Sequence, residues 1–295
     1  MIAIQILIPF FISFGTIYLV IQYVMHKTHQ IKQRGRSPLT KKLLRSPGES
    51  IRNKLESIHD DLIMTVSMIT IIPISMYSIW AFNQTKQSAF IAISIGLISI
   101  IYLTKSLLKK KNEQQRLTVG LEAEMATGQE LNQLMMDGYH VFHDLQLQDN
   151  SFNIDHVIVG PGGVYAVETK GRSKPINAKG KAEWEIECKG DTLIFPGWEE
   201  TKPIEQARFQ ARELQKWICA AIAEPIVVQP ALRIHGWNVK GRFPKDVKIL
   251  YGNPRNFFAR GQKTLEQETI KRIAFQLEQK CRDVEPTSHS ITKPK

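Results

Sequence analysis

Two carboxylates and a lysine stand close together near the middle of the chain. Asp155 lies in a short run of mostly β-branched residues, 154–159, and Glu168 lies in a second run, 164–169, which Lys170 follows. Side chains alternate along a strand, so Glu168 and Lys170 are expected on one face. Carboxylates are the hard oxygen ligands that Mg²⁺ prefers, and an ammonium beside them can place a water and stabilise negative charge. The three residues therefore suit metal-dependent phosphodiester hydrolysis, although a Glu-x-Lys pair alone is also common on solvated strand faces.

A β-hairpin is the element that would bring these side chains together. The two runs flank Gly-Pro-Gly-Gly at 160–163, and such a break between Val/Ile-rich segments predicts a turn. Around this hairpin, helical spacing of apolar residues predicts helices within 117–135, 203–223 and 265–277. Further strands are predicted from apolar or alternating runs. They are 139–147, 182–188 and two short central strands, 226–228 and 247–251.

The wider stretch from 116 to 230 matches a family pattern in residue order, spacing and predicted strand context. The matching residues are Gly120, Glu124, Leu131, Ile154, Asp155, His156, Gly163, Glu168, Lys170, Trp184, Pro203 and Gln206. This stretch resembles the NERD (nuclease-related domain) family of the PD-(D/E)XK superfamily. The resemblance implies a restriction-endonuclease-like fold and nuclease chemistry.

Roles for five residues follow from the resemblance. It implies that Asp155 and Glu168 bind the metal ion and that Lys170 is the catalytic lysine. It also implies that Glu124, on the preceding helix, completes the metal site. Gln206 would be the supporting polar residue of the next helix. The implied cofactor is Mg²⁺, with Mn²⁺ as an alternative, and the implied partner is nucleic acid, DNA ahead of RNA.

The helix glutamate has two competitors, because a small shift in register would place Glu122 or Glu130 at its position. Only Glu124 has both Gly120 four residues before it and Leu131 seven residues after it. Glu124 is therefore the preferred assignment.

Histidines and cysteines give no separate site. His140 and His143 are three residues apart, which on a strand puts them on opposite faces, and His156 should point away from Asp155. Packing or surface roles are expected in place of a zinc site, which needs convergent ligands. The three cysteines are widely spaced and odd in number, which favours a reducing compartment.

Charge and hydropathy divide the chain at about residue 111. Residues 1–116 carry 15 Lys/Arg and 5 Asp/Glu, whereas residues 117–295 carry 24 and 23, so the basic excess belongs to the first part. This part contains three uncharged apolar runs at about 2–25, 62–82 and 88–104, each close to the length that crosses a bilayer. The runs predict three transmembrane helices within a membrane segment, 1–111.

The distribution of Lys and Arg predicts the orientation of these helices. Nine Lys/Arg lie between 27 and 61 and four follow the third run, but the short connection at 83–87 holds only Lys86. Positive segments stay on the cytoplasmic side, so the loop 26–61 and everything after residue 105 should be cytoplasmic and the amino terminus outside. The predicted localisation is a multi-pass protein of the cell (inner) membrane.

The sequence thus predicts an α/β protein: a restriction-endonuclease-like mixed sheet flanked by helices over 112–284, after three transmembrane helices, with a disordered tail at 285–295. The predicted function is a membrane-anchored, metal-dependent nuclease, and the partners are nucleic acid and the lipid bilayer. Two alternatives stay open. One is a catalytically silent nucleic-acid- or protein-binding module, and the other is a membrane signalling scaffold. The sequence does not predict the oligomeric state or whether the enzyme is an endo- or exonuclease.

Overall fold

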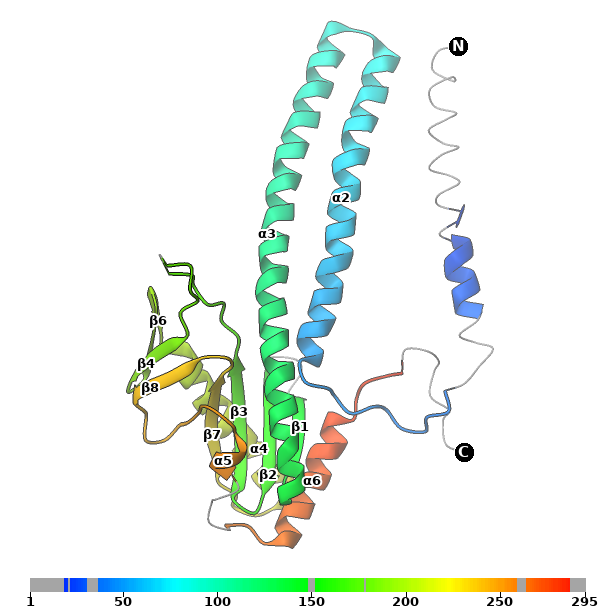
Figure 1. Ribbon diagram of the computed structural model, residues 1–295. Helices are drawn as coiled ribbons and strands as arrows, with labels where there is room; N and C mark the ends of the chain where they lie inside the picture. Colours follow the sequence, from blue (N-terminus) through cyan, green and yellow to red (C-terminus); the bar gives the residue numbers. More distant parts are fainter. Residues whose placement is uncertain are drawn as a thin grey trace. The chain divides into compact units, whose positions relative to one another are not determined.

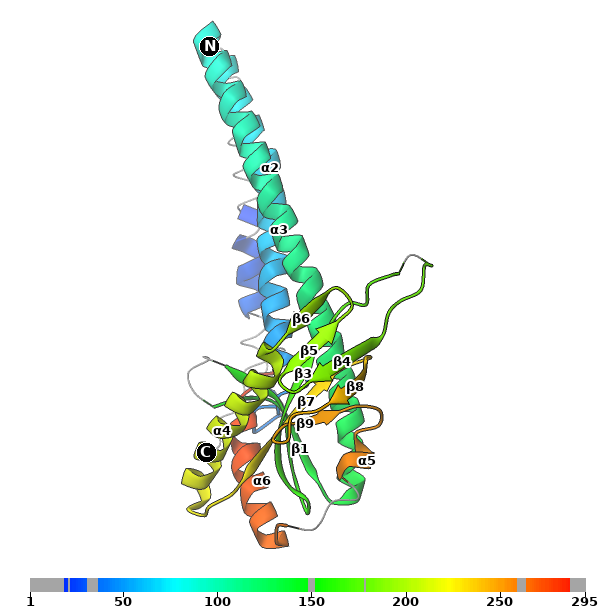
Figure 2. The same ribbon diagram turned by 90° about the vertical axis from the view of Figure 1, so that its left-hand side faces the viewer.

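A computed structural model describes residues 19–20, 22–30, 37–147, 152–177, 179–258 and 264–286. It contains long helices, a five-stranded sheet and a four-stranded sheet (Figures 1 and 2). The helical elements are α2 (Glu49–Asn83), α3 (Lys86–Asn132), η1 (Gln133–Asp137), α4 (Lys202–Ile222), α5 (Arg255–Phe258) and α6 (Gln267–Cys281). The strands are β1 (His140–Gln146), β2 (Asn153–Gly160), β3 (Gly163–Lys170), β4 (Glu185–Lys189), β5 (Thr192–Phe195), β6 (Trp198–Glu200), β7 (Val228–Ile234), β8 (Asn238–Arg242) and β9 (Lys248–Leu250).

Two compact units make up the described chain. One unit combines Leu43–Lys54 with Arg116–Val284, and the other contains Leu55–Gln115 together with both chain termini. The first of these is called the sheet unit below, and it holds both sheets. The second contains the apolar parts of α2 and α3.

The five-stranded sheet of the sheet unit is mixed, as the sequence predicted. Its strand order is β1-β2-β3-β7-β9, with β1, β2 and β3 antiparallel and β3, β7 and β9 parallel. The predicted hairpin is present, since Gly160 pairs with Gly163 at the β2–β3 turn. The last strand differs from the prediction. Residues 226–228 and 247–251 were expected in two central strands. Only Val228 of the first run lies in a strand, as the first residue of the central β7, and β9 lies at the edge.

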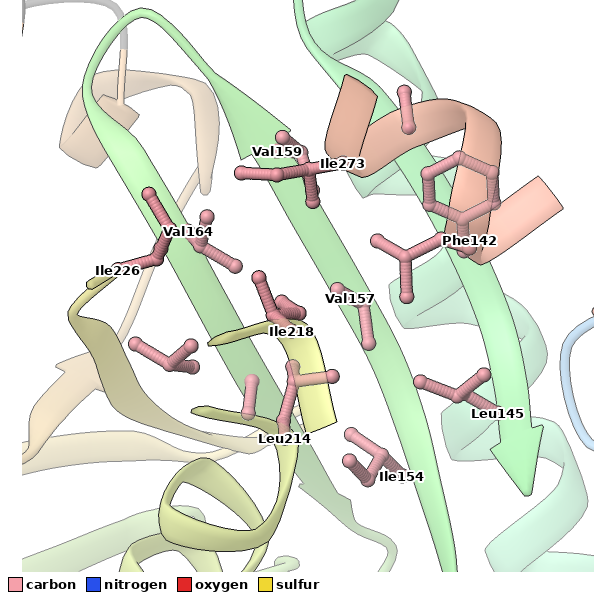
Figure 3. Close-up of a cluster of buried hydrophobic side chains, with 14 of the residues drawn as sticks. Phe142, Leu145, Ile154, Val157, Val159, Val164, Leu214, Ile218, Ile226 and Ile273 are labelled. Carbon is pink, nitrogen blue, oxygen red and sulfur yellow. The ribbon is translucent and has the colours of Figure 1, made fainter. Parts of the chain in front are cut away.

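Helices cover both faces of this sheet. On one face, residues of β1–β3 pack against α4 and α6. Figure 3 shows Val157 and Val164 near Ile218 of α4, and Val159 near Ile273 of α6. On the other face, Ile158 and the remaining alternate residues pack with the ends of α3 and η1 and with α5. The alternation follows from the period of two along a strand. Because both faces are covered, nearly every residue of β2 and β3 is buried.

The four-stranded sheet was not predicted as a separate sheet. Its order is β6-β5-β4-β8, and β8 pairs with β4 in parallel, so Glu185 lies opposite Asn238. A second apolar cluster fills the space between this sheet, β7, β9 and the beginning of α4. The prediction of one mixed sheet is therefore right for β1–β3, β7 and β9 but omits this second layer.

Two helices of the described chain are long and apolar enough to cross a membrane, by length and composition alone. They are α2 and α3, which contain the predicted spans 62–82 and 88–104. Pro73 lies inside α2 without ending it. Most of the predicted span 2–25 and of the tail 285–295 lies outside the described residues. Three spanning helices are therefore not shown, and α3 continues without a break into the soluble helix predicted for 117–135.

Candidate active site

The β2–β3 hairpin brings Asp155 and Glu168 together. His156 lies opposite Val167 in this antiparallel pair of strands. Asp155 and Glu168 are the next residues of β2 and β3, so they face each other across the pair. Both carboxylates are buried. The backbone N–H of Thr169 donates a 2.7 Å hydrogen bond to Asp155 Oδ2. The strand pairing itself therefore fixes the position of Asp155.

Lys170 lies on the same face as Glu168, as the alternation along β3 predicts. Its ammonium donates to Glu168 Oε1 and, at 3.0 Å, to Gln206 Oε1 on α4. The lysine side chain remains partly exposed, whereas Glu168 is only 1% exposed. A positive charge thus stands at the solvent side of a buried carboxylate. Gln206 holds this ammonium in place.

Gln210 is a site residue that the sequence reasoning missed. It is buried on α4, and its amide donates to Glu168 Oε2 and, at 3.0 Å, to the Asn153 carbonyl. Gln206 and Gln210 are four residues apart, which places them on the same helical face. That spacing in the sequence could have indicated Gln210 as a site residue. Together the two glutamines and Lys170 hold both oxygens of Glu168 in a fixed orientation.

Glu124 joins the group from α3. Gly171 allows this approach, because a methyl group added at its Cα would lie 2.4 Å from the Val119 carbonyl oxygen of α3. Of the competing glutamates, Glu122 is exposed and Glu130 pairs with Arg233 at 2.9 Å. Glu124, and neither competitor, interacts electrostatically with Asp155 and Glu168.

Burial and mutual repulsion make the three carboxylates hard to ionise together. Burial raises the pKa of Glu124 to about 8, with further contributions from the charges of Asp144 and Glu168. Burial likewise raises the pKa of Asp155 well above its usual range, with repulsion from Glu168 and Glu124 added. Burial also raises the pKa of Glu168, although Lys170 opposes this shift. Perturbed groups of this kind gather at functional sites.

The donor set suits a hard divalent cation. The charges of three carboxylates interact, and Glu124 Oε2 is buried without a hydrogen-bond partner among the described residues. A cation would relieve the repulsion that raises the pKa values. In the described parts of the chain, however, no three His, Cys, Asp or Glu side chains are already arranged around a common ligand position. Glu168 is instead engaged by Lys170 and Gln210, so metal binding would require these contacts to adjust.

His143 and His156 pack inside the fold, whereas His140 is exposed. His143 and His156 are cross-strand partners, and their Nδ1 atoms are 2.9 Å apart. His143 Nε2 lies 3.0 Å from Asn132 Oδ1 at the end of α3. Burial lowers the pKa of His143 to about 4, so the ring is neutral near pH 7. His156 belongs to this pair and not to the carboxylate group.

Comparison with known families bears directly on this site. Residues 119–235 match the model of the nuclease-related domain, NERD. The match confirms the resemblance noted for residues 116–230, and it is consistent with the PD-(D/E)XK superfamily. It includes the three carboxylates and Lys170, together with Gln206 and Gln210 of α4. Comparisons with curated proteins and with solved structures give no match. The match covers most of the sheet unit.

Asp155→Asn is expected to separate metal binding from folding. Asparagine keeps an oxygen that can accept from Thr169 N but removes one of the crowded charges, so stability in EDTA should stay equal or rise. Substitution of outer-shell partners alone typically weakens metal binding by about 10–100-fold, so the loss of a direct ligand should weaken Mg²⁺ binding at least that much. Thermal unfolding with and without Mg²⁺ measures both effects. A sharp loss of stability in EDTA would show that Asp155 is a structural residue.

The same charges predict how stability depends on pH in EDTA. A carboxyl group whose pKa is raised by folding binds more protons in the folded than in the unfolded protein, so stability falls as pH rises. For Glu124 this fall should extend from about pH 4.5 to about pH 8. Glu124→Gln should flatten the profile over this range when unfolding is followed by tryptophan fluorescence. An unchanged profile would exclude Glu124 from the group of coupled carboxylates.

Proposed function

We propose that the chain is a membrane-anchored, metal-dependent nuclease that hydrolyses phosphodiester bonds, with DNA as its substrate. The observation that carries the proposal is the group formed by Glu124, Asp155 and Glu168 with the Lys170 ammonium beside it, inside the NERD match. The proposed cofactor is Mg²⁺, with Mn²⁺ as an alternative. The choice of DNA as the substrate rests on the family resemblance.

Each residue of the site has a proposed task. Asp155, Glu168 and Glu124 would hold the divalent ion. When bound, such an ion lowers the pKa of a coordinated water and neutralises charge on the phosphate. Lys170 stands at the exposed edge of the carboxylates, where its ammonium can orient the attacking water and stabilise the negative charge that develops on phosphate oxygens. Gln206 and Gln210 keep Lys170 and Glu168 aligned.

Cleavage assays with the full chain test this function. Labelled DNA and RNA are incubated with the protein in detergent micelles, with Mg²⁺, Mn²⁺ or EDTA. The proposal expects DNA cleavage that requires the divalent ion. Binding of nucleic acid without cleavage in all three conditions would favour the silent binding module instead.

Membrane anchoring by α2 and α3 is part of the proposal. The chain enters the sheet unit with Leu43–Lys54, leaves it, and returns with Arg116–Val284. Across a membrane, both ends of the intervening segment would lie on the side that holds the sheet unit, and α2 and α3 would cross as a hairpin. The flanking lysines and arginines support a cytoplasmic location for this side. With a first span at 2–25, the amino terminus would lie outside.

Reporter fusions give the expected topology a direct test. A reporter inserted at Gln84, in the turn between α2 and α3, should be external, and reporters after Lys111 or at Lys295 should be cytoplasmic. Alkaline phosphatase and fluorescent-protein fusions at these positions measure the two sides. Gln84 and Lys295 on the same side would exclude the hairpin crossing.

A further inference from the structure

A short segment that ends in the first turn of α2 is built into the sheet unit. Residues 43–50, called the strap below, precede the predicted membrane hairpin but cluster with Arg116–Val284. Leu43 forms an antiparallel bridge with Val284, through hydrogen bonds of 2.8 and 3.2 Å. The Arg45 backbone N–H donates to the Cys281 carbonyl at the end of α6 at 2.9 Å. The strap therefore pairs with the C-terminal end of the sheet unit.

A buried ion pair fastens the strap to β1. The side chains of Arg45 and Asp144 are only 8% and 0% exposed, and the guanidinium reaches Asp144 Oδ2 at 2.6 and 2.9 Å. The Ser50 backbone N–H and hydroxyl donate to the same oxygen at 2.8 and 2.7 Å. Arg45 also contacts Asp283 at 3.0 Å. Asp144 has a φ of +50°, which is uncommon for a residue with a side chain. This set of contacts holds it there.

The strap lies against the part of α3 that carries Glu124. A methyl group added at Gly128 would lie 2.6 Å from Pro47 Cγ, so only glycine lets α3 and the strap approach this closely. A methyl group added at Gly48 would lie 2.3 Å from Leu121 Cδ1 and 3.6 Å from Glu124 Oε2. The strap thus contacts α3 on either side of Glu124.

We propose that the strap positions Glu124 for the candidate nuclease site, with Arg45 and Gly48 as its positioning residues. This inference rests on the proposed function and adds a requirement to it. The carboxylates of β2 and β3 are fixed by strand pairing, but Glu124 comes from a helix that other contacts must hold in register. Arg45 fixes the strap through Asp144, and Pro47 and Gly48 fix α3 through Gly128 and Leu121. A segment outside the NERD match would therefore complete the site.

Gly48→Ala tests the proposal with Gly190→Ala as its matched control. Both glycines have positive φ, +71° and +61°, so alanine strains both backbones. Only Gly48 faces α3, since nothing lies within 4 Å of a methyl group at Gly190. The full chain in detergent micelles is assayed for Mn²⁺ binding by electron paramagnetic resonance. Hydrogen exchange of α3 residues 119–131 is measured on the same samples, at a temperature where every variant is folded.

The expected result is that Gly48→Ala weakens Mn²⁺ binding by about tenfold or more, the usual effect of disturbing an outer-shell support. Exchange in α3 should rise as well, while Gly190→Ala should behave like the wild type. Arg45→Ala should act like Gly48→Ala, and Arg45→Lys should recover part of the Mn²⁺ affinity because it keeps the charge.

Two other results have clear meanings. Faster exchange or lower stability with unchanged Mn²⁺ affinity would overturn the proposal, because the strap would then be only a stabilising segment. If the wild type itself binds no Mn²⁺, the proposed nuclease function fails. The role of the strap is then decided by the hydrogen-exchange measurement alone. Faster exchange confined to residues 119–131 of α3 in Gly48→Ala would then support positioning of the helix turn that carries Glu124. Unchanged exchange, or faster exchange throughout the sheet unit, would overturn it.

Discussion

Lys170→Ala should lower DNA cleavage by about 10² or more, the effect of removing one preorganised charge-stabilising group. The fold, metal binding and much of the DNA affinity should remain, because the lysine is partly exposed and lies at the edge of the carboxylate group. Single-turnover cleavage at saturating DNA and Mg²⁺ measures the chemical step. The matched controls are Lys174→Ala and Lys179→Ala. Both lysines are exposed and form no ion pair within the described residues.

The controls should show a different kind of effect. A lysine that only contacts phosphate contributes through counterion release, so its loss should weaken DNA binding modestly and more strongly at low salt. Lys170→Arg sharpens the distinction. It keeps the charge but replaces a compact ammonium with a planar fork, which should not fit between Glu168 and Gln206. Equal cleavage by the wild type, Lys170→Ala and Lys170→Arg would defeat the catalytic assignment.

Arg45→Ala should lower the free energy of unfolding by about 3–5 kcal/mol, because it leaves the Asp144 carboxylate buried without its cation. Asp144→Asn in the same chain should recover much of this loss by removing the uncompensated charge. Urea unfolding of the full chain in EDTA, followed by tryptophan fluorescence, measures the free energies. EDTA removes any contribution from bound metal.

The matched control for the ion pair is Arg255→Ala. Arg255 binds Asp137 through two hydrogen bonds, as Arg45 binds Asp144, but its side chain is 43% exposed. Exposed ion pairs add little to stability, so this variant should change it far less. A loss in Arg45→Ala no larger than that in Arg255→Ala would show that the strap is not fastened by its ion pair.

The β2–β3 hairpin and α4 could be predicted from the sequence because their signals are local. Gly160–Gly163 pairing is specified by turn residues, and the apolar face of α4 repeats at helical spacing. Lys170, Glu168 and Asp155 then follow from alternation along two adjacent strands. The family pattern gave the choice of Glu124 among three nearby glutamates.

The missed features depend on residues that are distant in the sequence. β4 pairs with β8 across about fifty residues, and neither strand is long or strongly apolar. Arg45 and Asp144 are 99 positions apart. The sequence of the strap alone is that of a basic loop and does not reveal Asp144 as its partner. Gln210 is a different case, because its spacing of four residues from Gln206 can be read from the sequence. The predicted domain border at residue 112 does not include the strap, so a fragment that begins there lacks Arg45.

Locating a bound Mn²⁺ ion tests the central claim most directly. Crystals of the full chain grown with Mn²⁺ would show the ion by its anomalous scattering. The account predicts one strong peak in contact with the carboxylates of Asp155 and Glu168, on the side facing Glu124, and its loss in Asp155→Asn. A peak at another group of ligands, or a peak that persists in Asp155→Asn, would contradict the claim that these carboxylates form the metal site.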